Sequence, residues 1–344
     1  MRATVMYGER DVRLEQVPDP QLATGRDAIV RVVAACVCGS DLWGYRGVVP
    51  TSSPRRMGHE FVGVVEQVGV EVRNVREGDF VIASFYDCDY TCEVCRSGFS
   101  SACIELDWYD GCQAELVRVP HADGSLVVVP EGYGPFDASN PLVPHLLTLA
   151  DVMGTGHHAA HSANVTEGST VAVVGDGAVG LSAVIAAKRL QASRIVVMSR
   201  NPARQALARE FGATEIVEER GKEGADIIKQ MFGGIGPDAV LEAVGTEQSM
   251  EQATRAVRPG GIVGYVGVPN GVPSIPLRPL FSNNTRLAGG VAPVRNYVDE
   301  LLADVLSGSI EPGRVFDLAL PLDEVAEAYA AMDERRAIKA LLWP

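Results

Sequence analysis

Two short segments near the amino terminus carry side chains that bind metals and transfer protons. Residues 38–41 have the sequence CGSD, and residues 58–60 have the sequence GHE. Together they offer a thiolate, an imidazole and two carboxylates. Zinc accepts mixed sulfur, nitrogen and carboxylate ligands, and a catalytic zinc keeps three protein ligands and one open position. We therefore expect Cys38 and His59 to bind zinc, with a third ligand from elsewhere in the chain.

Two neighbours of this pair indicate how such a site would work. Asp41 can orient the imidazole of His59, a contact that metal-binding histidines usually have. Ser40 follows the Cys38 thiolate by two residues, so its hydroxyl can receive the proton of a bound alcohol. By spacing alone, a single cysteine and a single histidine remain a weak motif.

A glycine-rich turn in the middle of the chain predicts a nucleotide site. Residues 175–180 have the sequence GDGAVG, which fits G-x-G-x-x-G, after an apolar run and before an alanine-rich helix. In that context the first glycine permits the tight turn, the second admits the pyrophosphate, and the third lets helix and strand pack. The alternative is a tight turn without a ligand. The candidate coenzyme-binding residues here are Gly175, Gly177, Ala178, Val179 and Gly180.

The end of the next expected strand predicts which coenzyme binds. An NAD site has an acidic residue there, about 20 residues after the turn, that accepts from the ribose hydroxyls. This chain has Ser199 and Arg200 instead, followed one helical turn later by Arg204. A hydroxyl and two cations suit a 2′-phosphate, so NADP is expected over NAD. The alternative is that both arginines are ordinary surface residues.

Composition limits the function classes. The 344 residues carry a net charge of −14 without a basic run, which argues against nucleic-acid binding and against anionic membranes. The charged amino terminus and the lack of a long apolar run predict a cytoplasmic protein. Four of the seven cysteines lie between positions 88 and 103, a spacing that indicates metal binding in a reducing compartment.

The hydrophobic pattern predicts two domains. Strands at 28–35 and 61–72 make the first third β-rich, whereas strands and helices alternate after residue 144 as in a doubly wound parallel sheet. The tail from about residue 288 is expected to return to the first domain. The other expected helices are 146–163, 178–190, 202–211, 298–306 and 322–332, and the other expected strands are 169–174, 194–198, 238–244 and 262–268.

In these motifs and their order, the sequence resembles the zinc-dependent medium-chain alcohol dehydrogenases. The resemblance rests on the segments 38–41, 58–63 and 175–180, on Asp151 and on the glycine pair 260–261. It implies an α/β protein with a GroES-like β-rich catalytic domain (1–150 and 288–344) and a Rossmann domain (151–287). It also implies that Asp151 is the third zinc ligand, and that Glu60 approaches the metal. Without this resemblance, Asp151 would be taken for a surface or helix-start carboxylate.

Asp151 and the Ser199-Arg200 pair resemble most the NADP-dependent secondary alcohol dehydrogenases. The resemblance implies that zinc lowers the pKa of the alcohol, that Ser40 relays the proton, and that hydride passes to NADP. Trp43 stands where the family often has a further relay histidine. The resemblance also places Lys339 at the coenzyme pyrophosphate, with a solvent-facing lysine as the alternative, and Val268 is a further candidate coenzyme contact.

A second zinc site is implied by the cysteine-rich lobe. The family pattern C-x2-C-x2-C-x7-C falls here on Asp89, Cys92, Cys95 and Cys103, with a carboxylate as the first ligand. We expect a filled structural site with Asp89 as the fourth ligand. The alternatives are that Cys88 replaces Asp89, or that the lobe holds no metal.

The predicted function is hydride transfer between NADP(H) and an alcohol, ketone or aldehyde, by a homodimer or homotetramer. The alternatives are a C=C or C=N reductase of the same fold and a non-catalytic NADPH-binding protein. The complete zinc ligand set argues against the first, and the net charge of −14 and Ser40 argue against the second. Aromatic side chains suggest an apolar or ring-bearing substrate, although such residues are more often core. The candidate pocket residues are Trp43, Phe85, Trp108 and Tyr109.

Overall fold

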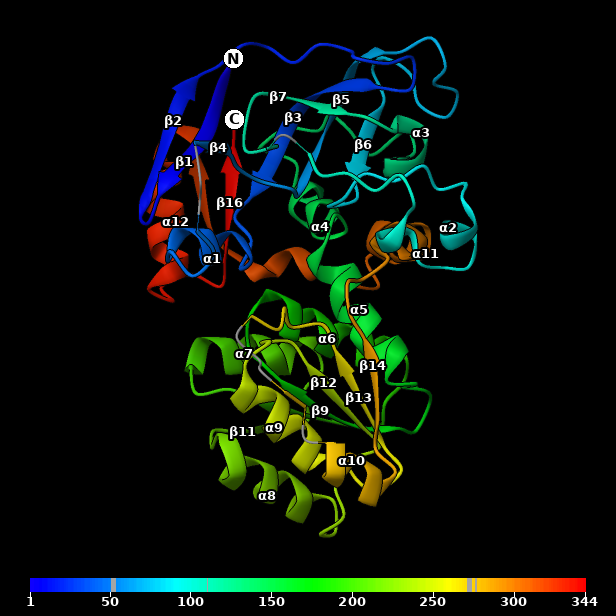
Figure 1. Cartoon of the computed structure of the whole chain (residues 1–344), viewed down its shortest axis with the longest axis vertical. Coiled ribbons are helices and arrows are strands. Elements are labelled where there is room, and N and C mark those ends of the chain that lie inside the picture. Colours follow the sequence, from blue (N-terminus) through cyan, green and yellow to red (C-terminus); the bar gives the residue numbers. More distant parts are fainter. Residues whose placement is uncertain (51–53, 110, 271–273, 276) are drawn as a thin grey trace. The chain divides into compact units, whose positions relative to one another are not determined.

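The computed structural model describes residues 1–50, 54–109, 111–270, 274–275 and 277–344, and its contacts divide them into two compact units. One unit consists of Met1–Asp151 and Pro293–Pro344, and the other of Val152–Ala292. The changes of unit thus fall after Asp151 and Ala292, against expected boundaries after residues 150 and 287. The predicted α/β class is confirmed, with a β-rich first unit and alternating strands and helices in the second (Figure 1).

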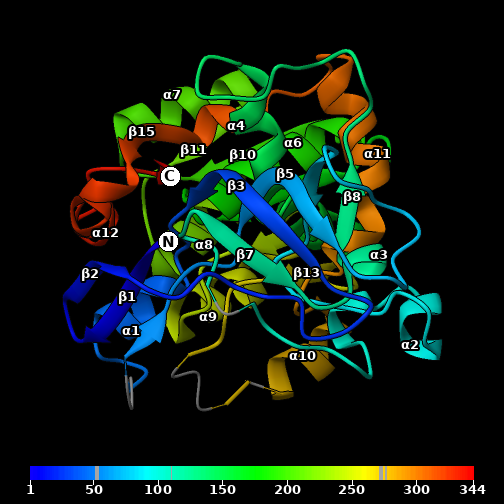
Figure 2. The same ribbon diagram turned by 90° about the horizontal axis from the view of Figure 1, so that it is seen from above.

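The first unit is organised around a seven-stranded sheet in the order β15-β16-β3-β5-β6-β8, with β7 also paired to β3. Its central strand β3 (Ala28–Cys36) pairs antiparallel with β5, β7 and β16, and Figure 2 shows β3, β5 and β7 side by side. The tail therefore returns to the first unit. The other strands are β5 (Phe61–Val68), β6 (Phe80–Ala83), β7 (Leu116–Val119), β8 (Leu126–Val128), β15 (Phe316–Pro321) and β16 (Lys339–Trp343).

Smaller elements complete this unit. A three-stranded sheet has the order β2-β1-β4, with β1 (Arg2–Gly8), β2 (Asp11–Gln16) and β4 (Arg55–Arg56). The helices are α1 (Asp41–Tyr45), α2 (Glu93–Arg96), α3 (Ala122–Ser125), α4 (Leu142–Thr148), α11 (Val294–Leu306) and α12 (Val325–Asp333), with short 3-10 turns at Ser100–Ala102, Pro312–Val315 and Leu322–Glu324.

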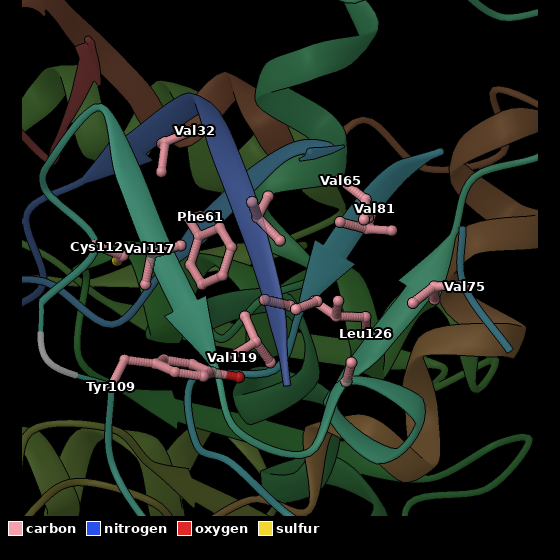
Figure 3. Close-up of a cluster of buried hydrophobic side chains, with 14 of the residues drawn as sticks. Val32, Phe61, Val65, Val75, Val81, Tyr109, Cys112, Val117, Val119 and Leu126 are labelled. Carbon is pink, nitrogen blue, oxygen red and sulfur yellow. The ribbon is translucent and has the colours of Figure 1, made fainter. Parts of the chain in front are cut away.

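A hydrophobic core holds β3 and β5 in register (Figure 3). Phe61, at the start of β5, is fully buried in it, with the ring of Tyr109 edge-on at 5.5 Å. Gly63 makes the close approach of the two strands possible, because a Cβ there would lie 2.2 Å from the Arg31 carbonyl oxygen of β3. The register pairs Ala35 with Phe61, which brings the residues after β3 close to those before β5.

The second unit contains a six-stranded parallel sheet in the order β11-β10-β9-β12-β13-β14. The central strands of this sheet are buried on both faces, which explains their continuous apolar runs. Because β9 lies between β10 and β12, the chain reverses direction along the sheet there, where doubly wound proteins bind ligands. The strands are β9 (Thr170–Val174), β10 (Arg194–Met198), β11 (Glu215–Val217), β12 (Ala239–Glu242), β13 (Ile262–Tyr265) and β14 (Arg286–Gly289).

The helices of this unit pack in pairs, α5 against α6 and α8 against α9. They are α5 (Val152–Ser162), α6 (Ala178–Arg189), α7 (Pro202–Phe211), α8 (Gly221–Met231), α9 (Glu247–Ala256) and α10 (Leu277–Asn283). Among the helices that the structure describes, none is long and apolar enough to cross a membrane.

The prediction of one continuous helix over residues 146–163 was wrong. The chain forms α4 and α5 instead, separated by residues 149–151, whose backbone N–H groups donate to carbonyls three residues earlier rather than four. This tighter turn interrupts the helix at Asp151. The interruption decides where the Asp151 carboxylate points.

Candidate active site and coenzyme site

Four side chains from three separate segments meet in the first unit. One ligand atom each from Cys38, His59, Glu60 and Asp151 lies within 4.8 Å of all the others. Cys38 follows β3, the adjacent pair His59 and Glu60 precedes β5, and Asp151 ends the turn after α4. The antiparallel pairing of β3 with β5 brings the first two segments together, and the helix interruption supplies the third.

The distances within this cluster suit a single small cation. The Asp151 Oδ2 atom lies 3.8 Å from Cys38 Sγ and 3.8 Å from His59 Nε2. His59 Nε2 also lies 3.9 Å from Glu60 Oε1. One sulfur, one imidazole nitrogen and carboxylate oxygens around one point form a donor set that zinc accepts. The residues present therefore fit the metal that the sequence predicts.

Asp41 touches two of these residues at once. Its Oδ1 atom lies 3.5 Å from His59 Nδ1, and its Oδ2 atom accepts a hydrogen bond of 3.0 Å from the Cys38 backbone N–H. Burial lowers the pKa of His59, but the neighbouring Cys38 and Asp41 more than compensate and raise it to about 10. The imidazole thus lies in a negative environment that attracts a cation.

Gln113 and Tyr329 were missed by the sequence analysis. The Gln113 side-chain amide donates to Asp41 Oδ2 at 3.2 Å and to the Cys36 carbonyl at 3.1 Å, and its own carbonyl accepts from the Tyr329 hydroxyl at 3.0 Å. These contacts fix the carboxylate that orients His59. No local motif marks either residue, because both reach the site only through the tertiary fold.

Lys339 is buried beside the metal-ligand cluster. Its Nζ atom donates to Glu60 Oε1 at 2.7 Å and to the Val37 carbonyl at 3.2 Å, and the side chain is 1% exposed. The alternative of a solvent-facing lysine is therefore wrong, whereas its contact with a coenzyme pyrophosphate stays a prediction. Glu60 Oε2 is also buried and has no hydrogen-bond partner among the described residues, so it is available to a cation.

The expected second metal site is assembled in the lobe of residues 88–103. Four side chains of this lobe again place one ligand atom each within 4.8 Å of the others, namely those of Asp89, Cys92, Cys95 and Cys103. Asp89 Oδ1 lies 3.1 Å from Cys103 Sγ and 3.4 Å from Cys95 Sγ. Burial opposes ionisation of Asp89, but hydrogen bonds from Thr91, Cys103 and Cys92 outweigh it and hold the pKa well below its usual range.

Cys88 points away from this set. It is fully buried, and its Sγ atom lies 3.6 Å from the Gly124 carbonyl. Burial, with a smaller contribution from Cys103, raises the pKa of its thiol to about 12. The geometry favours Asp89 over Cys88.

The turn after Asp89 is held by α11, another feature that the sequence analysis missed. Tyr90 has a left-handed backbone with φ of 55°, which is costly for a residue with a side chain. The Arg295 guanidinium lies over its ring at 4.3 Å, and the Asn296 amide donates to its hydroxyl at 3.4 Å. Ser100, on the other side of the lobe, donates its hydroxyl to Asn296 at 2.5 Å.

The predicted pocket residues separate into two groups. Phe85 lies near the metal ligands, with its ring 6.2 Å from that of His59, and Trp108 stacks against Phe85 at 6.3 Å with 53% of its surface exposed. Trp43 is partly exposed on α1, three residues after the exposed Ser40. Tyr109, by contrast, is a core residue, because its ring packs against Phe61 and its hydroxyl donates to the Tyr86 carbonyl (Figure 3).

The glycine turn lies at the carboxyl end of β9. Gly175 has a φ of 125°, and a Cβ at Gly180 would lie 2.2 Å from the Gly175 carbonyl oxygen, so both positions require glycine. A Cβ at Gly177 would meet no atom of the described residues within 4 Å, which leaves space for a ligand. Ala178 and Val179 begin α6.

The predicted 2′-phosphate residues gather around this turn. The Ser199 hydroxyl donates to Asp176 Oδ2 at 2.9 Å, and Arg204 Nη1 lies 3.5 Å from Asp176 Oδ1. Arg200 is exposed, and its Nε atom donates to the Glu218 carbonyl at 2.8 Å. Val268, expected to end a strand, lies beyond β13 and is 50% exposed. No local motif predicts a role for Asp176.

Comparison with known families gives two matches. Residues 24–131 match the alcohol dehydrogenase GroES-like domain, and residues 178–307 match the zinc-binding dehydrogenase family. The GroES-like part of the prediction is thereby confirmed.

Individual relatives agree with these matches. The chain is 36% identical to a probable zinc-binding alcohol dehydrogenase of Mycobacterium tuberculosis, over 97% of this chain and 86% of the relative. It is 32% identical to zinc-type alcohol dehydrogenase B of Aspergillus flavus, over 99% of this chain and 81% of that relative. The solved alcohol dehydrogenase of Thermus sp. ATN1 superposes with a TM-score of 0.90 at 34% identity, covering 100% of this chain and 99% of that one.

Proposed function

Because this chain belongs to the zinc-type medium-chain alcohol dehydrogenases, we propose that it transfers hydride between NADP(H) and an alcohol or the corresponding ketone or aldehyde. The observation that carries the proposal is the convergence of Cys38, His59, Glu60 and Asp151 on one point. Relatives that reduce C=C bonds usually lack such a set, so a carbonyl or an alcohol is the better substrate.

Cys38, His59 and Asp151 would hold the catalytic zinc. When bound, zinc polarises the oxygen of the substrate and lowers the pKa of an alcohol. A carboxylate as third ligand donates less charge than a thiolate, which leaves the metal a stronger Lewis acid. Asp41 keeps the imidazole in place, and the ion pair with Lys339 restrains Glu60 at the edge of the cluster.

Ser40 is the proposed group that takes the proton of the alcohol. It is exposed and lies two residues after Cys38, and no hydrogen bond of its hydroxyl caps α1. The hydroxyl can therefore turn toward the substrate and pass the proton on. Trp43, three residues later, offers an aromatic surface instead of a further proton acceptor. We propose that Ser40 passes the proton on, and that a bound coenzyme would supply the next acceptor.

The second cluster supports a structural zinc. Three thiolates and the Asp89 carboxylate make a closed set of four ligands, which leaves no position for a substrate. Such a metal would stabilise the lobe of residues 88–103. It would not take part in the reaction.

NADP is the proposed coenzyme. No carboxylate follows β10, and Ser199 and Arg200 stand where an NAD site would have an acidic residue. Arg204 adds a second cation close to the glycine turn. Gly175, Gly177 and Gly180 would admit the pyrophosphate, and Lys339 and Val268 are further candidate contacts.

The substrate is proposed to be apolar or ring-bearing. Phe85 and Trp108 present stacked rings next to His59, and Trp43 adds another aromatic side chain close to Ser40. Aromatic walls favour ligands with apolar surface. Secondary and benzylic alcohols are accordingly the first substrates to test, with polyols as the polar comparison.

The decisive experiment is oxidation of this panel of alcohols with NADP and with NAD. It is run on enzyme of measured zinc content, before and after removal of the metal by a chelator. We expect NADP-dependent turnover that falls with zinc removal and returns on adding zinc. Unchanged turnover after verified zinc removal would contradict the mechanism, and a preference for NAD would contradict the coenzyme assignment alone.

We propose, from the family resemblance, a homodimer or homotetramer in the cytoplasm. Light scattering during size-exclusion chromatography, at several concentrations, measures the assembly. A single species with the mass of one chain, 36.6 kDa, would contradict it.

A further inference from the structure

The glycine turn contains a buried carboxylate that lies among the groups proposed to bind a 2′-phosphate. Asp176 is 6% exposed, and its neighbours Ser199 and Arg204 are 2% and 6% exposed. In the parallel register Val174 of β9 lies opposite Met198 of β10, so the residues that follow the two strands emerge side by side. The carboxylate of the turn therefore meets the serine that follows β10.

These contacts occupy the donors that a phosphate would need. The Ser199 hydroxyl has one proton, and it is donated to Asp176 Oδ2 at 2.9 Å. Arg204 Nη1 donates to the Asp176 backbone carbonyl at 3.3 Å and lies 3.5 Å from its Oδ1 atom. Part of the positive charge of Arg204 is thereby balanced before any coenzyme binds.

We propose that Asp176 is a specificity-determining residue that opposes the 2′-phosphate and so limits the preference for NADP over NAD. This inference rests on the proposed function, namely that a dinucleotide binds at the turn. A doubly charged phosphate next to a carboxylate is repelled, and like charges in a partly buried site are costly. An unphosphorylated ribose, in contrast, finds in Asp176 an acceptor for its hydroxyl groups.

The neighbouring charges set the balance. Arg200 is exposed beside Ser199 and Arg204 lies on α7, and both attract the phosphate, whereas Asp176 repels it. The open space at Gly177 lets the coenzyme backbone come close to the turn. The carboxylate thus acts on coenzyme choice without contacting the reacting carbon.

The test compares the enzyme with Asp176→Asn, which keeps the size of the side chain and its ability to accept from Ser199. The measurements are kcat/KM for NADP and for NAD, and the Kd of NADPH and NADH from fluorescence. We expect the NADP to NAD ratio of kcat/KM to rise by about tenfold or more, with tighter NADPH binding. Asp226→Asn is the matched control, because it removes a carboxylate of the same unit that pairs with Arg255 of another helix. We expect the NADP to NAD ratio of this control variant to stay unchanged.

A ratio that stays within about twofold of the wild type in Asp176→Asn would overturn the inference. If this variant does not fold, as judged by its melting curve, Asp176→Ser is measured in the same way. The outcome is separate from that of the proposed function. A wild-type preference for NAD with a rise in the variant would support the role of Asp176 and contradict only the NADP assignment.

Discussion

The Lys339 ammonium lies 2.7 Å from the Glu60 carboxylate, with 1% and 0% of the two side chains exposed. Lys339 begins the last strand, β16, and Glu60 directly follows His59, so the pair connects the end of the chain to the metal-ligand cluster. Burial opposes both charges, yet the attraction within the cluster raises the pKa of Lys339 and lowers that of Glu60. Both groups are therefore charged at neutral pH.

Removing one partner of this pair is expected to destabilise the fold. Lys339→Met leaves a buried carboxylate without its cation, a change that costs about 3–5 kcal/mol in comparable pairs. The double variant Lys339→Met/Glu60→Gln removes both charges and should recover part of the loss. Urea unfolding gives the free energy of unfolding of the single and the double variant. A single variant as stable as the wild type would show that Glu60 is uncharged or paired otherwise.

Asp151→Asn is expected to remove the catalytic metal. An amide is a weaker zinc ligand than a carboxylate, and loss of Lewis-acid stabilisation of several kcal/mol lowers kcat/KM by about 10³-fold or more. Metal analysis should show one zinc fewer per chain. Asp107→Asn serves as the control, because Asp107 is an exposed carboxylate outside both clusters. Full zinc content and activity in Asp151→Asn would exclude it as a ligand.

Asp41→Asn tests the residue that orients His59. Substituting a group that holds a metal-binding histidine typically lowers metal affinity by about 10–100-fold. We expect a faster loss of zinc to a chelator, followed with a colorimetric zinc indicator. The ligands themselves remain, so high zinc concentrations should restore activity. Zinc release at the wild-type rate would contradict the orienting role.

The lobe of residues 88–103 offers a matched pair of variants. Asp89→Ala removes a ligand from the second cluster and should reduce the zinc content from two to one per chain, while Cys88→Ser should leave both. Thermal unfolding of Asp89→Ala is expected at a lower temperature, since structural zinc contributes to folding. The reverse pattern of zinc content would identify Cys88 as the ligand, and one zinc in the wild type would mean an empty lobe.

His158 on α5 predicts a loss of stability in acid. Burial, with smaller contributions from His161 and His157, lowers its pKa from 6.5 to about 4. The unfolded chain therefore binds more protons than the folded chain between these values, so stability is full above about pH 6.5 and falls as pH decreases toward 4.

The measurement is the free energy of unfolding of the wild type and of His158→Gln between pH 7 and pH 5. The wild type should lose more than the variant over this interval, by about 1–2 kcal/mol. His161→Gln is the comparison, because His161 is an exposed histidine of the same helix that makes only a smaller contribution to the pKa shift of His158, so its pH profile should stay close to that of the wild type. Parallel pH profiles of wild type and His158→Gln would contradict the assignment.

Local sequence carries enough information for the main elements and motifs. The turn at Gly175 follows an apolar strand and starts a helix, and its glycines are required by backbone conformation and close packing within that same segment. Cys38 and His59 could be found because few residue types bind zinc strongly. Asp151 came from the family resemblance, since a lone carboxylate has no local signature.

The tertiary structure decided which side chains meet. Asp89 and Cys88 are neighbours in sequence, yet they point to different surroundings, because in an irregular segment each backbone dihedral redirects the following side chain. The contact of Asp176 with Ser199 depends on the register of β9 with β10, and that of Lys339 with Glu60 on the return of β16 to the sheet. The sequence by itself thus determined the chemical groups and the strands, turns and helices that carry them. Long-range strand pairing, which no single segment encodes, determined which of these groups meet.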